Sequence, residues 1–235
     1  MDKYKIANLN VLMNCKYPRI TLQANKYKED FSGSADISLE LSDDFYQARL
    51  KENPHLTIDE IEYIYLGSLF YNKILDFNGF LLHSSAIAMD NNAYLFSADS
   101  GVGKSTHTQN WINYFGEDKV TYINDDKPVI RKINGEFYCC GTPFSGKTNL
   151  SSNLCVPIKA IVFIKRGKDN SIQEIDSKTA IDLIFSQTLY KLDQNKVIRL
   201  LELLDELLRK VKVYELTCNM DVESAKVAYE YLNKE

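Results

Sequence analysis

One segment of the sequence combines glycines, a lysine and hydroxyl side chains at a spacing typical of phosphate binding. Residues 97–106 are Ser-Ala-Asp-Ser-Gly-Val-Gly-Lys-Ser-Thr, and the apolar run 93–96 precedes them. This is the pattern G-x-x-x-x-G-K-[ST], with Ala98 in place of the first glycine. Gly101 and Gly103 allow the backbone to curl so that its N–H groups face an anion. The segment therefore predicts a phosphate-binding loop, with a chance glycine-rich turn as the alternative.

The residues of this loop are expected to share the binding of a nucleotide. The helix that begins near Lys104 adds the positive end of its dipole at the same place. Lys104 is expected to reach the β and γ phosphates, and the Ser105 hydroxyl to ligate magnesium. The nucleotide-binding residues predicted in the loop are Asp99, Ser100, Gly101, Val102, Gly103, Lys104, Ser105 and Thr106.

Two adjacent carboxylates, Asp125 and Asp126, follow the next short apolar strand. A carboxylate at such a strand end holds magnesium or its water in phosphate-loop proteins. With two, one side chain can hold the metal while the other accepts the proton of an attacking hydroxyl. Asp-Asp-Lys-Pro is also good turn chemistry, so an ordinary turn is the alternative. The upstream phosphate loop favours a catalytic or metal-binding interpretation.

His83 lies in an apolar stretch ahead of the loop, with Ser84 and Ser85 beside it. Polar side chains in a buried strand are costly unless they have partners. A site role and a satisfied core histidine are both compatible with this context. His55 and His107 lack such neighbours, and we expect His107 on the helix surface or packed against the sheet.

The run from Leu82-His83 through residues 101–105 to Asp125-Asp126 resembles the kinase domain of the HPr kinase/phosphorylase family. The spacing from histidine to lysine, the Ser-Gly-Val-Gly-Lys-Ser sequence and the position of the aspartate pair all agree. The resemblance covers roughly residues 80–165. That family shares its nucleotide site with phosphoenolpyruvate carboxykinases and transfers phosphate from ATP, or in some members pyrophosphate, to a protein serine.

Roles for individual residues are implied by this resemblance. Lys104 would hold the β and γ phosphates of ATP, and Asp125 would be the general base near the acceptor hydroxyl. Ser105 and Asp126 would bind Mg²⁺, and His83 would lie close to the transferred phosphate. Asp125, Lys104 and His83 are accordingly the expected catalytic residues. The resemblance also implies a possible homo-oligomer.

The sequence departs from the family after the aspartate pair. The Glu-Arg-Gly segment that supports phosphorolysis is not recognisable, and residues 141–150 are Gly-Thr-Pro-Phe-Ser-Gly-Lys-Thr-Asn-Leu. The chain resembles a shorter HPr-kinase-like subfamily, some of whose members are associated with the maturation of ribosomally made peptides. HPr itself is therefore not the expected substrate. Lys147 can bring a second positive charge to the phosphates, and a surface loop with an incidental lysine is the alternative.

The pattern of elements predicts an α/β fold with a mixed sheet. Strands alternate with helices around the loop, and Asn134-Gly135 predicts a hairpin that interrupts the parallel pattern. The capping box that starts at Thr57 predicts a buried helix with Ile61 and Ile64 on its inner face. A strand is expected over 80–89, and a helix with Val197, Leu200, Leu201, Leu204 and Leu208 on one stripe. Residues 1–76 are expected to form a strand-rich N-terminal extension. The resemblance implies that 77–235 form a P-loop kinase domain of the HPr kinase/phosphoenolpyruvate carboxykinase type.

Composition limits the possible partners. The 235 residues carry a net charge of −4, which argues against nucleic-acid binding. No apolar stretch approaches the roughly 18 residues of a membrane span, and the N-terminus lacks the apolar core of a secretory signal. Five cysteines, an odd number, predict reduced thiols and a cytoplasmic protein.

The sequence and its resemblance predict a Mg²⁺-dependent ATP phosphotransferase that acts on a hydroxyl, as in a serine of a peptide or protein. A small-molecule kinase and a non-catalytic nucleotide-binding regulatory module are the alternatives. A GTP-driven switch is disfavoured because Asn-Lys-x-Asp does not follow the loop. The acceptor, the choice among ATP, GTP and pyrophosphate, the oligomeric state and the role of residues 1–76 stay open at this point.

Overall fold

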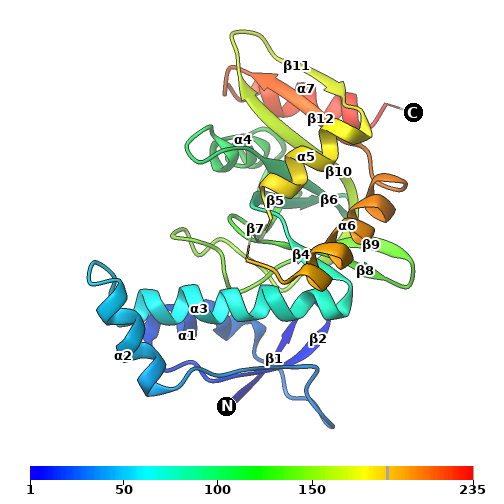
Figure 1. The fold of residues 1–235 in the computed structure, drawn as a ribbon. Coiled ribbons are helices and arrows are strands. Elements are labelled where there is room, and N and C mark those ends of the chain that lie inside the picture. Colours follow the sequence, from blue (N-terminus) through cyan, green and yellow to red (C-terminus); the bar gives the residue numbers. More distant parts are fainter. Residues whose placement is uncertain (189–190, 235) are drawn as a thin grey trace.

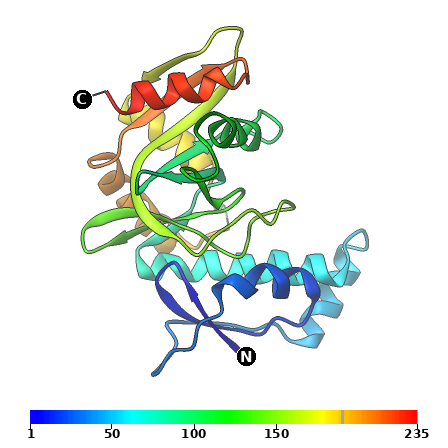
Figure 2. The same cartoon turned by 180° about the vertical axis from the view of Figure 1, so that it is seen from behind.

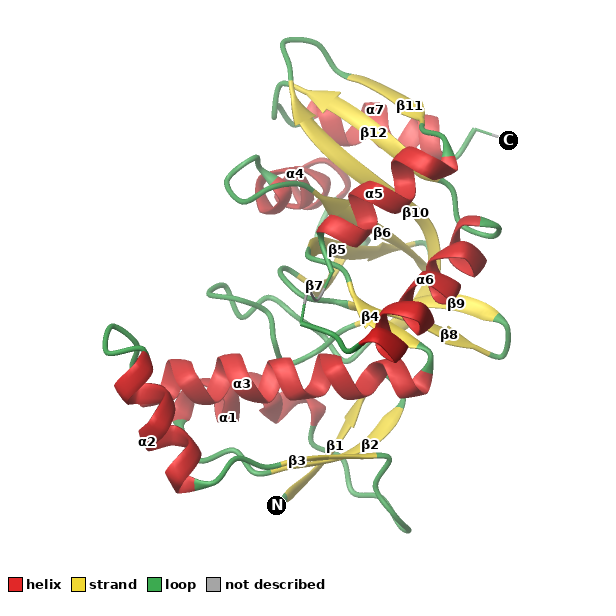
Figure 3. Ribbon diagram, viewed as in Figure 1, coloured by secondary structure: helices red, strands yellow, loops and turns green. Residues whose placement is uncertain are grey.

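The long helix α3 (Ile58–Lys73) lies between a small N-terminal sheet and a large curled sheet (Figure 1). The structure, a computed structural model, describes residues 1–188 and 191–234. The predicted second domain, 77–235, thus contains residues 189, 190 and 235, which lie outside the described residues. Figure 3 shows the mixture of helices and strands in both parts, which confirms the α/β class.

The N-terminal sheet begins with a hairpin of β1 (Asp2–Ile6) and β2 (Leu9–Met13), and β3 (Ile37–Leu39) adds to β2 in parallel. Ala7 and Asn8 both have positive φ, as a two-residue hairpin turn requires. Helical segments that the sequence did not predict cover this sheet. They are α1 (Pro18–Ala24), η1 (Asn25–Tyr27) and α2 (Asp43–Glu52).

Helix α3 begins at the predicted capping box. The Thr57 Oγ1 accepts a hydrogen bond from the Glu60 amide at 3.2 Å, and the Glu60 carboxylate accepts one from the Thr57 amide at 2.9 Å. Ile61 is buried as expected, but Ile64 is exposed, which corrects the prediction for that position. The core around α3 also contains Phe144 from the later chain. Residues 1–76 therefore share a core with the rest of the molecule.

The large sheet has nine strands within the described residues, in the order β4-β8-β9-β10-β6-β5-β7, with β12 on β10 and β11 on β12. β10 pairs in parallel with β6 and β12 and antiparallel with β9, so it runs through the curl of the sheet (Figure 2). The strands are β4 (Gly79–Leu81), β5 (Ser84–Met89), β6 (Asn92–Ser97), β7 (Thr121–Asn124), β8 (Val129–Ile133), β9 (Glu136–Cys140), β10 (Cys155–Arg166), β11 (Ser171–Glu174) and β12 (Val213–Cys218).

Helices cover both faces of the central strands, which explains why these strands are apolar throughout. Alternate residues of β6 and β10, such as Leu95 and Ile161, face a core made with α5 (Ser177–Ser186) and α6 (Gln194–Leu208). Their neighbours, such as Phe96, face a core made with α4 (Lys104–Phe115) and α7 (Glu223–Leu232). A short 3₁₀ segment, η2 (Ile74–Phe77), links α3 to β4.

Several expected elements differ in the structure. The strand predicted over 80–89 is two strands, because Leu82 and His83 donate their amides to Pro128 and Gln187 rather than to a strand ladder. The buried stripe of α6 contains Leu203 and Leu207, whereas Leu201 is exposed. The sequence did not predict β11 or α5.

The cysteines also differ from expectation. Cys140 of β9 and Cys155 of β10 are register partners, and the structure joins them in a disulfide. Cys15, Cys139 and Cys218 are free. The prediction that all five thiols are reduced is therefore wrong for one pair, which comes together only because β9 and β10 are adjacent. None of the helices in the described part of the chain combines the length and hydrophobicity that a membrane span requires.

Candidate phosphate-binding and catalytic site

The predicted phosphate loop connects β6 to the first turn of α4. Gly101 and Gly103 have φ values of +81° and +127°, a region that side chains disfavour. A Cβ at Gly103 would also collide with the side chain of Met220. The loop thus has the curled backbone that the sequence predicted, and the positive φ of Gly103 is the main reason for a glycine there.

Lys104 is the first residue of α4, and its side chain turns back over the loop. Its Nζ donates to the Ala98 carbonyl at 2.9 Å, and the residue is 9% exposed. Burial lowers the pKa of Lys104, although the negative charges of Asp126, Asp125 and Asp99 oppose this. The charge of Lys104 is therefore poorly solvated and available to an anion at the loop.

Asn124, the last residue of β7, builds the turn that carries the two aspartates. Its side-chain oxygen accepts hydrogen bonds from the amides of Asp126 and Lys127 at 2.8 and 2.7 Å. Its side-chain nitrogen donates to the Thr142 carbonyl at 2.9 Å. The sequence left a turn and a functional site as alternatives for these residues. The turn is present, and the same residues form the candidate site.

Asp125 is buried and receives a hydroxyl on each carboxylate oxygen. Ser85 donates to Oδ1 at 2.6 Å, and Thr148 donates to Oδ2 at 3.1 Å. The Ser85 hydroxyl also lies 2.8 Å from that of Thr108 on α4. These contacts fix the carboxylate between the loop that follows β9 and the first turns of α4. They also account for the buried Ser85 that the sequence singled out.

Asp126 faces His83 on the open side of the same turn. The His83 Nε2 lies 3.4 Å from Asp126 Oδ1, and the Lys127 Nζ lies 3.6 Å from Oδ2. Burial alone would raise the pKa of Asp126, but the hydrogen bond from His83 and the charges of Lys127, His83 and Lys104 lower it below its usual value. Asp126 is therefore held as a carboxylate.

Gln187, at the end of α5, links His83 to the phosphate loop. Its Oε1 lies 3.1 Å from His83 Nδ1, and its Nε2 donates to Asp99 Oδ1 at 3.2 Å. Because the amide nitrogen faces Asp99, Oε1 faces the histidine and Nδ1 is the donor in that contact. Both ring nitrogens of His83 are thus engaged, and the Nε2 contact with Asp126 is a hydrogen bond when the ring carries a proton on each nitrogen. No local pattern marks Gln187, which lies 88 residues from Asp99 along the chain.

Arg166 is a second residue that sequence reasoning missed. It ends β10, and its guanidinium donates to the carbonyls of Val102 and Gly101, both at 2.8 Å. These bonds occupy the carbonyls of Val102 and Gly101, and the Val102 amide donates to the Asp99 carbonyl at 3.3 Å. Because β10 pairs in parallel with β6, the ends of both strands meet at this edge, and only the pairing brings Arg166 to the loop.

Most of the predicted residues line one pocket of about 340 Å³. Its lining residues are His83, Ser100, Gly101, Gly103, Lys104, Ser105, Thr106, Asp125, Asp126 and Arg166. Asp99 and Val102 line a neighbouring cavity of about 490 Å³ instead, which shares Arg166 with the first. Lys147 is exposed and lines neither, so the structure does not bring it to the predicted phosphate site.

His107 belongs to the core, in keeping with one of the two expectations for it. Trp111 Nε1 donates to His107 Nε2 at 3.1 Å, and Nδ1 lies 3.2 Å from the Ser224 hydroxyl. Because Nε2 accepts, the ring is the neutral tautomer with its proton on Nδ1. Burial lowers the pKa of His107 to about 3. This histidine anchors α4 to α7 and has no contact with the pocket.

The donors of the pocket suit Mg²⁺ held jointly by protein and phosphate. Within the described residues, no group of three or more His, Cys, Asp or Glu side chains is arranged to hold a metal. Mg²⁺ is usually bound through one or two carboxylates together with substrate phosphates and water. The exposed Ser105 hydroxyl and the Asp126 carboxylate, which line the same pocket, match that requirement.

Comparisons with known proteins give only distant structural similarity. No protein-family model and no curated protein matches the chain. Among solved structures, the chain is similar to the HPr(Ser) kinase/phosphatase from Coxiella burnetii, with a TM-score of 0.39 and 7% sequence identity. The match covers 64% of this chain and 95% of that chain. The candidate site accordingly rests on its own geometry.

Proposed function

We propose that the protein is a Mg²⁺-dependent kinase that transfers the γ phosphate of ATP to a hydroxyl, namely a serine of a peptide or protein. One observation carries the proposal. Lys104 and Ser105 of the phosphate loop share a pocket with Asp125, Asp126 and His83, which come from two other segments. A protein that only binds phosphate has little use for two adjacent carboxylates there, because their like charges repel each other and the phosphate.

The proposed mechanism is an in-line transfer in which the chain positions the donor and removes one proton. The loop amides and Lys104 hold the β and γ phosphates, and their positive charge stabilises the transition state. Ser105 and Asp126 would hold Mg²⁺, which would neutralise charge on the phosphates. Asp125 accepts the proton of the attacking hydroxyl while Ser85 and Thr148 keep its carboxylate in place. His83 orients Asp126 and faces the transferred group.

The neighbouring cavity supports a nucleotide rather than pyrophosphate as the donor. Its walls include Phe163, Ile164 and Leu183, and it adjoins the phosphate pocket at Arg166. Apolar walls next to a phosphate site suit the base and ribose of a nucleotide, which pyrophosphate lacks. The cavity is therefore the proposed site of the adenosine moiety.

The decisive experiment measures transfer of labelled phosphate from ATP to serine peptides by the wild type and by Asp125→Asn. We expect kcat to fall about 10²-fold or more in the variant, the usual contribution of a general base, with little change in the Kd of ATP. Asp44→Asn is the matched control, because Asp44 is exposed on α2.

Other outcomes would redefine the proposal. Loss of ATP binding in Asp125→Asn would make Asp125 a metal ligand, and Asp126→Asn would then be tested as the base, since Asp126 is the carboxylate next to His83. ATP binding without transfer to any peptide would favour a regulatory nucleotide-binding module. Phosphate transfer only to free hydroxy compounds would favour a small-molecule kinase.

A further inference from the structure

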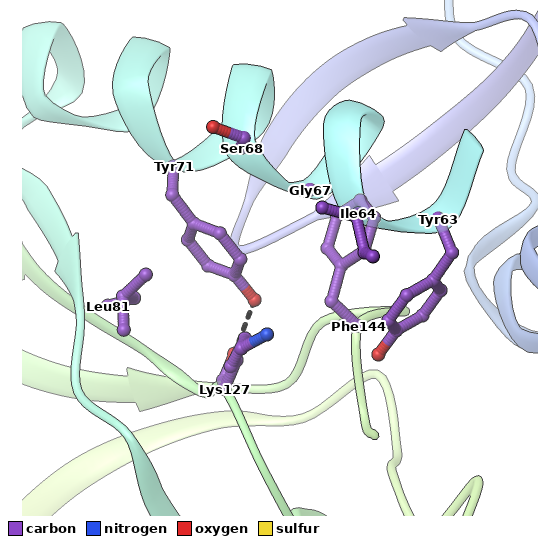
Figure 4. Close-up of a pocket in the computed structure, with 8 residues that line it drawn as sticks. All are labelled: Tyr63, Ile64, Gly67, Ser68, Tyr71, Leu81, Lys127 and Phe144. Carbon is purple, nitrogen blue, oxygen red and sulfur yellow. Dashed lines mark hydrogen bonds between the residues drawn. The ribbon is translucent and has the colours of Figure 1, made fainter. Parts of the chain in front are cut away.

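A second, apolar pocket of about 220 Å³ lies between α3 and the turn that carries the aspartate pair (Figure 4). Its walls are side chains of α3, the Leu81 side chain of β4, Lys127 and Phe144. The α3 residues are Tyr63, Ile64, Gly67, Ser68 and Tyr71. No residue of the candidate phosphate site lines it.

The shape of this apolar pocket depends on Gly67. A Cβ at that position would lie 3.0 Å from the ring of Phe144, which is tighter than ordinary contact. The missing side chain lets the Phe144 ring lie against the helix, where it also contacts the ring of Tyr63 at 5.8 Å between centroids. The inner wall is therefore a rigid aromatic surface.

The two tyrosine hydroxyls of the pocket already have partners within the protein. The Tyr71 hydroxyl donates to the Lys127 carbonyl at 2.6 Å, and the Tyr63 hydroxyl accepts a hydrogen bond from the Gly146 amide at 2.8 Å. The walls therefore present mainly rings and aliphatic groups to an occupant, together with the Lys127 side chain and the Ser68 hydroxyl. The rings and aliphatic groups suit an apolar ligand, because burying apolar surface against them is favourable.

The apolar pocket adjoins the phosphate pocket through two segments. Lys127 lines the apolar pocket, and its Nζ lies 3.6 Å from the carboxylate of Asp126, which lines the phosphate pocket. The loop that contributes Phe144 also contributes Thr148, which donates to Asp125. A group seated against Phe144 would thus hold its neighbouring atoms beside the two aspartates.

We propose that this pocket binds one apolar side chain of a peptide acceptor, next to the serine that receives the phosphate. The inference rests on the proposed kinase function. The pocket is smaller than the ~300–1,000 Å³ typical of whole small-molecule ligands, so it suits a single side chain. Ile64 and Ser68 are exposed at its rim, where the rest of a peptide can continue across α3.

The test uses peptides Gly-Gly-X-Ser-Gly-Gly and Gly-Gly-Ser-X-Gly-Gly, in which X is Phe, Leu, Ala or Asp. For the wild type we expect kcat/KM to be about tenfold higher with Phe or Leu than with Ala or Asp in at least one series. Ser68→Phe, which places a ring at the mouth of the pocket, should raise the KM of the preferred peptide about tenfold and leave the Kd of ATP unchanged. Ala48→Phe is the control, since Ala48 is exposed on α2 and the variant adds the same ring elsewhere.

The outcomes separate this inference from the proposed function. Peptide phosphorylation with no preference for apolar X, or with a KM that Ser68→Phe does not change, would overturn the pocket assignment and leave the kinase standing. If the wild type phosphorylates no peptide, calorimetric titration with the Phe peptides tests whether the pocket binds an apolar side chain. Binding that Ser68→Phe weakens and Ala48→Phe does not would support the pocket without the kinase, and no binding would overturn it.

Discussion

Two loops border the aspartate pair, and they obtain their conformations in different ways. Loop 98–103 is shaped by its own residues, through positive φ at Gly101 and Gly103 and the return of Lys104 to the Ala98 carbonyl. Loop 141–153 is held from outside, by residues 122–125 and by the N-terminal segment. An arginine donates to carbonyls of each loop, Arg166 to the first and Arg19 to the second.

The contacts of loop 141–153 with the N-terminal segment are numerous. Arg19 and Gln23 of α1 both donate to the Gly146 carbonyl at 3.1 Å, and the Tyr63 hydroxyl of α3 accepts from the Gly146 amide. Lys26 and Tyr27 donate to carbonyls of residues 149–152. Residues 1–76 therefore contact the candidate site through the loop that carries Thr148. In the proposed reaction, we expect residues 1–76 to influence the acceptor side and loop 98–103 the donor side.

The largest expected effect distinguishes the lysines of the two loops. Lys104→Ala should lower kcat/KM about 10²–10³-fold, because it removes a charge that stabilises the transferring phosphoryl group. Lys147→Ala should change it less than about twofold, because Lys147 is exposed and lines neither pocket at this edge. Steady-state phosphate transfer measures both, with circular dichroism to show that each variant is folded. Comparable losses in the two variants would contradict the distinction.

A second prediction concerns the anchor of α4 behind loop 98–103. The pKa of His107 is about 3 in the folded chain, and its ordinary value, expected in the unfolded chain, is 6.5. Between about pH 3 and pH 6.5, His107 therefore takes up a proton only in the unfolded chain. Stability is therefore full above pH 6.5 and falls as the pH decreases, by ~1.4 kcal/mol for each pH unit. From pH 6.5 to pH 5 the free energy of unfolding should drop by about 2 kcal/mol through His107.

Urea unfolding at the two pH values measures this effect. His107→Gln should lose most of the pH dependence, and His55→Gln should keep it, because His55 is exposed in solvent. An equal pH dependence in wild type and His107→Gln would show that the His107 contacts do not hold in solution.

The sequence predicted those parts of the site that depend on neighbouring residues. The phosphate loop, the helix after it and the turn with Asp125 and Asp126 all follow from short segments with special backbone or charge. Arg166, Gln187 and Thr148 could not be predicted, because each reaches the site from 23 to 88 residues away along the chain. Their local sequence does not indicate which strand ends lie next to each other in the sheet.

The same limit explains what was missed in the fold. The hairpin at Asn134-Gly135 and the capping box of α3 are local signals, and both are present. The exposure of Ile64 depends on how the loop with Phe144 packs against α3. The turn of α3 that carries Ile64 lines an open pocket and is not covered by core side chains. The disulfide likewise depends on strand pairing, since Cys140 and Cys155 lie 15 residues apart.

A third prediction tests the outside support of loop 141–153. Arg19→Ala removes a hydrogen bond to Gly146 and a guanidinium 3.8 Å from the centre of the Tyr63 ring. We expect kcat to fall about tenfold with the Kd of ATP unchanged, because losing a charged hydrogen bond of ~1.5 kcal/mol loosens the loop that holds Asp125. Arg209→Ala is the control, since Arg209 is exposed and pairs with Asp205 on the surface of α6. A weaker Kd for ATP without a change in kcat would contradict the assignment of this loop to the acceptor side.

The smallest expected effect comes from the arginine of the other loop. Arg166 is exposed, and solvent screening reduces what its two hydrogen bonds contribute. Arg166→Ala should therefore raise the Kd of ATP only about three- to fivefold and leave kcat within about twofold, because loop 98–103 keeps its own conformation. Arg166→Lys should recover only part of the affinity, since one ammonium cannot satisfy two carbonyls with the geometry of a guanidinium. Titration with ATP measures both, and a loss in kcat as large as that of Arg19→Ala would mean that loop 98–103 depends on outside support as much as loop 141–153 does.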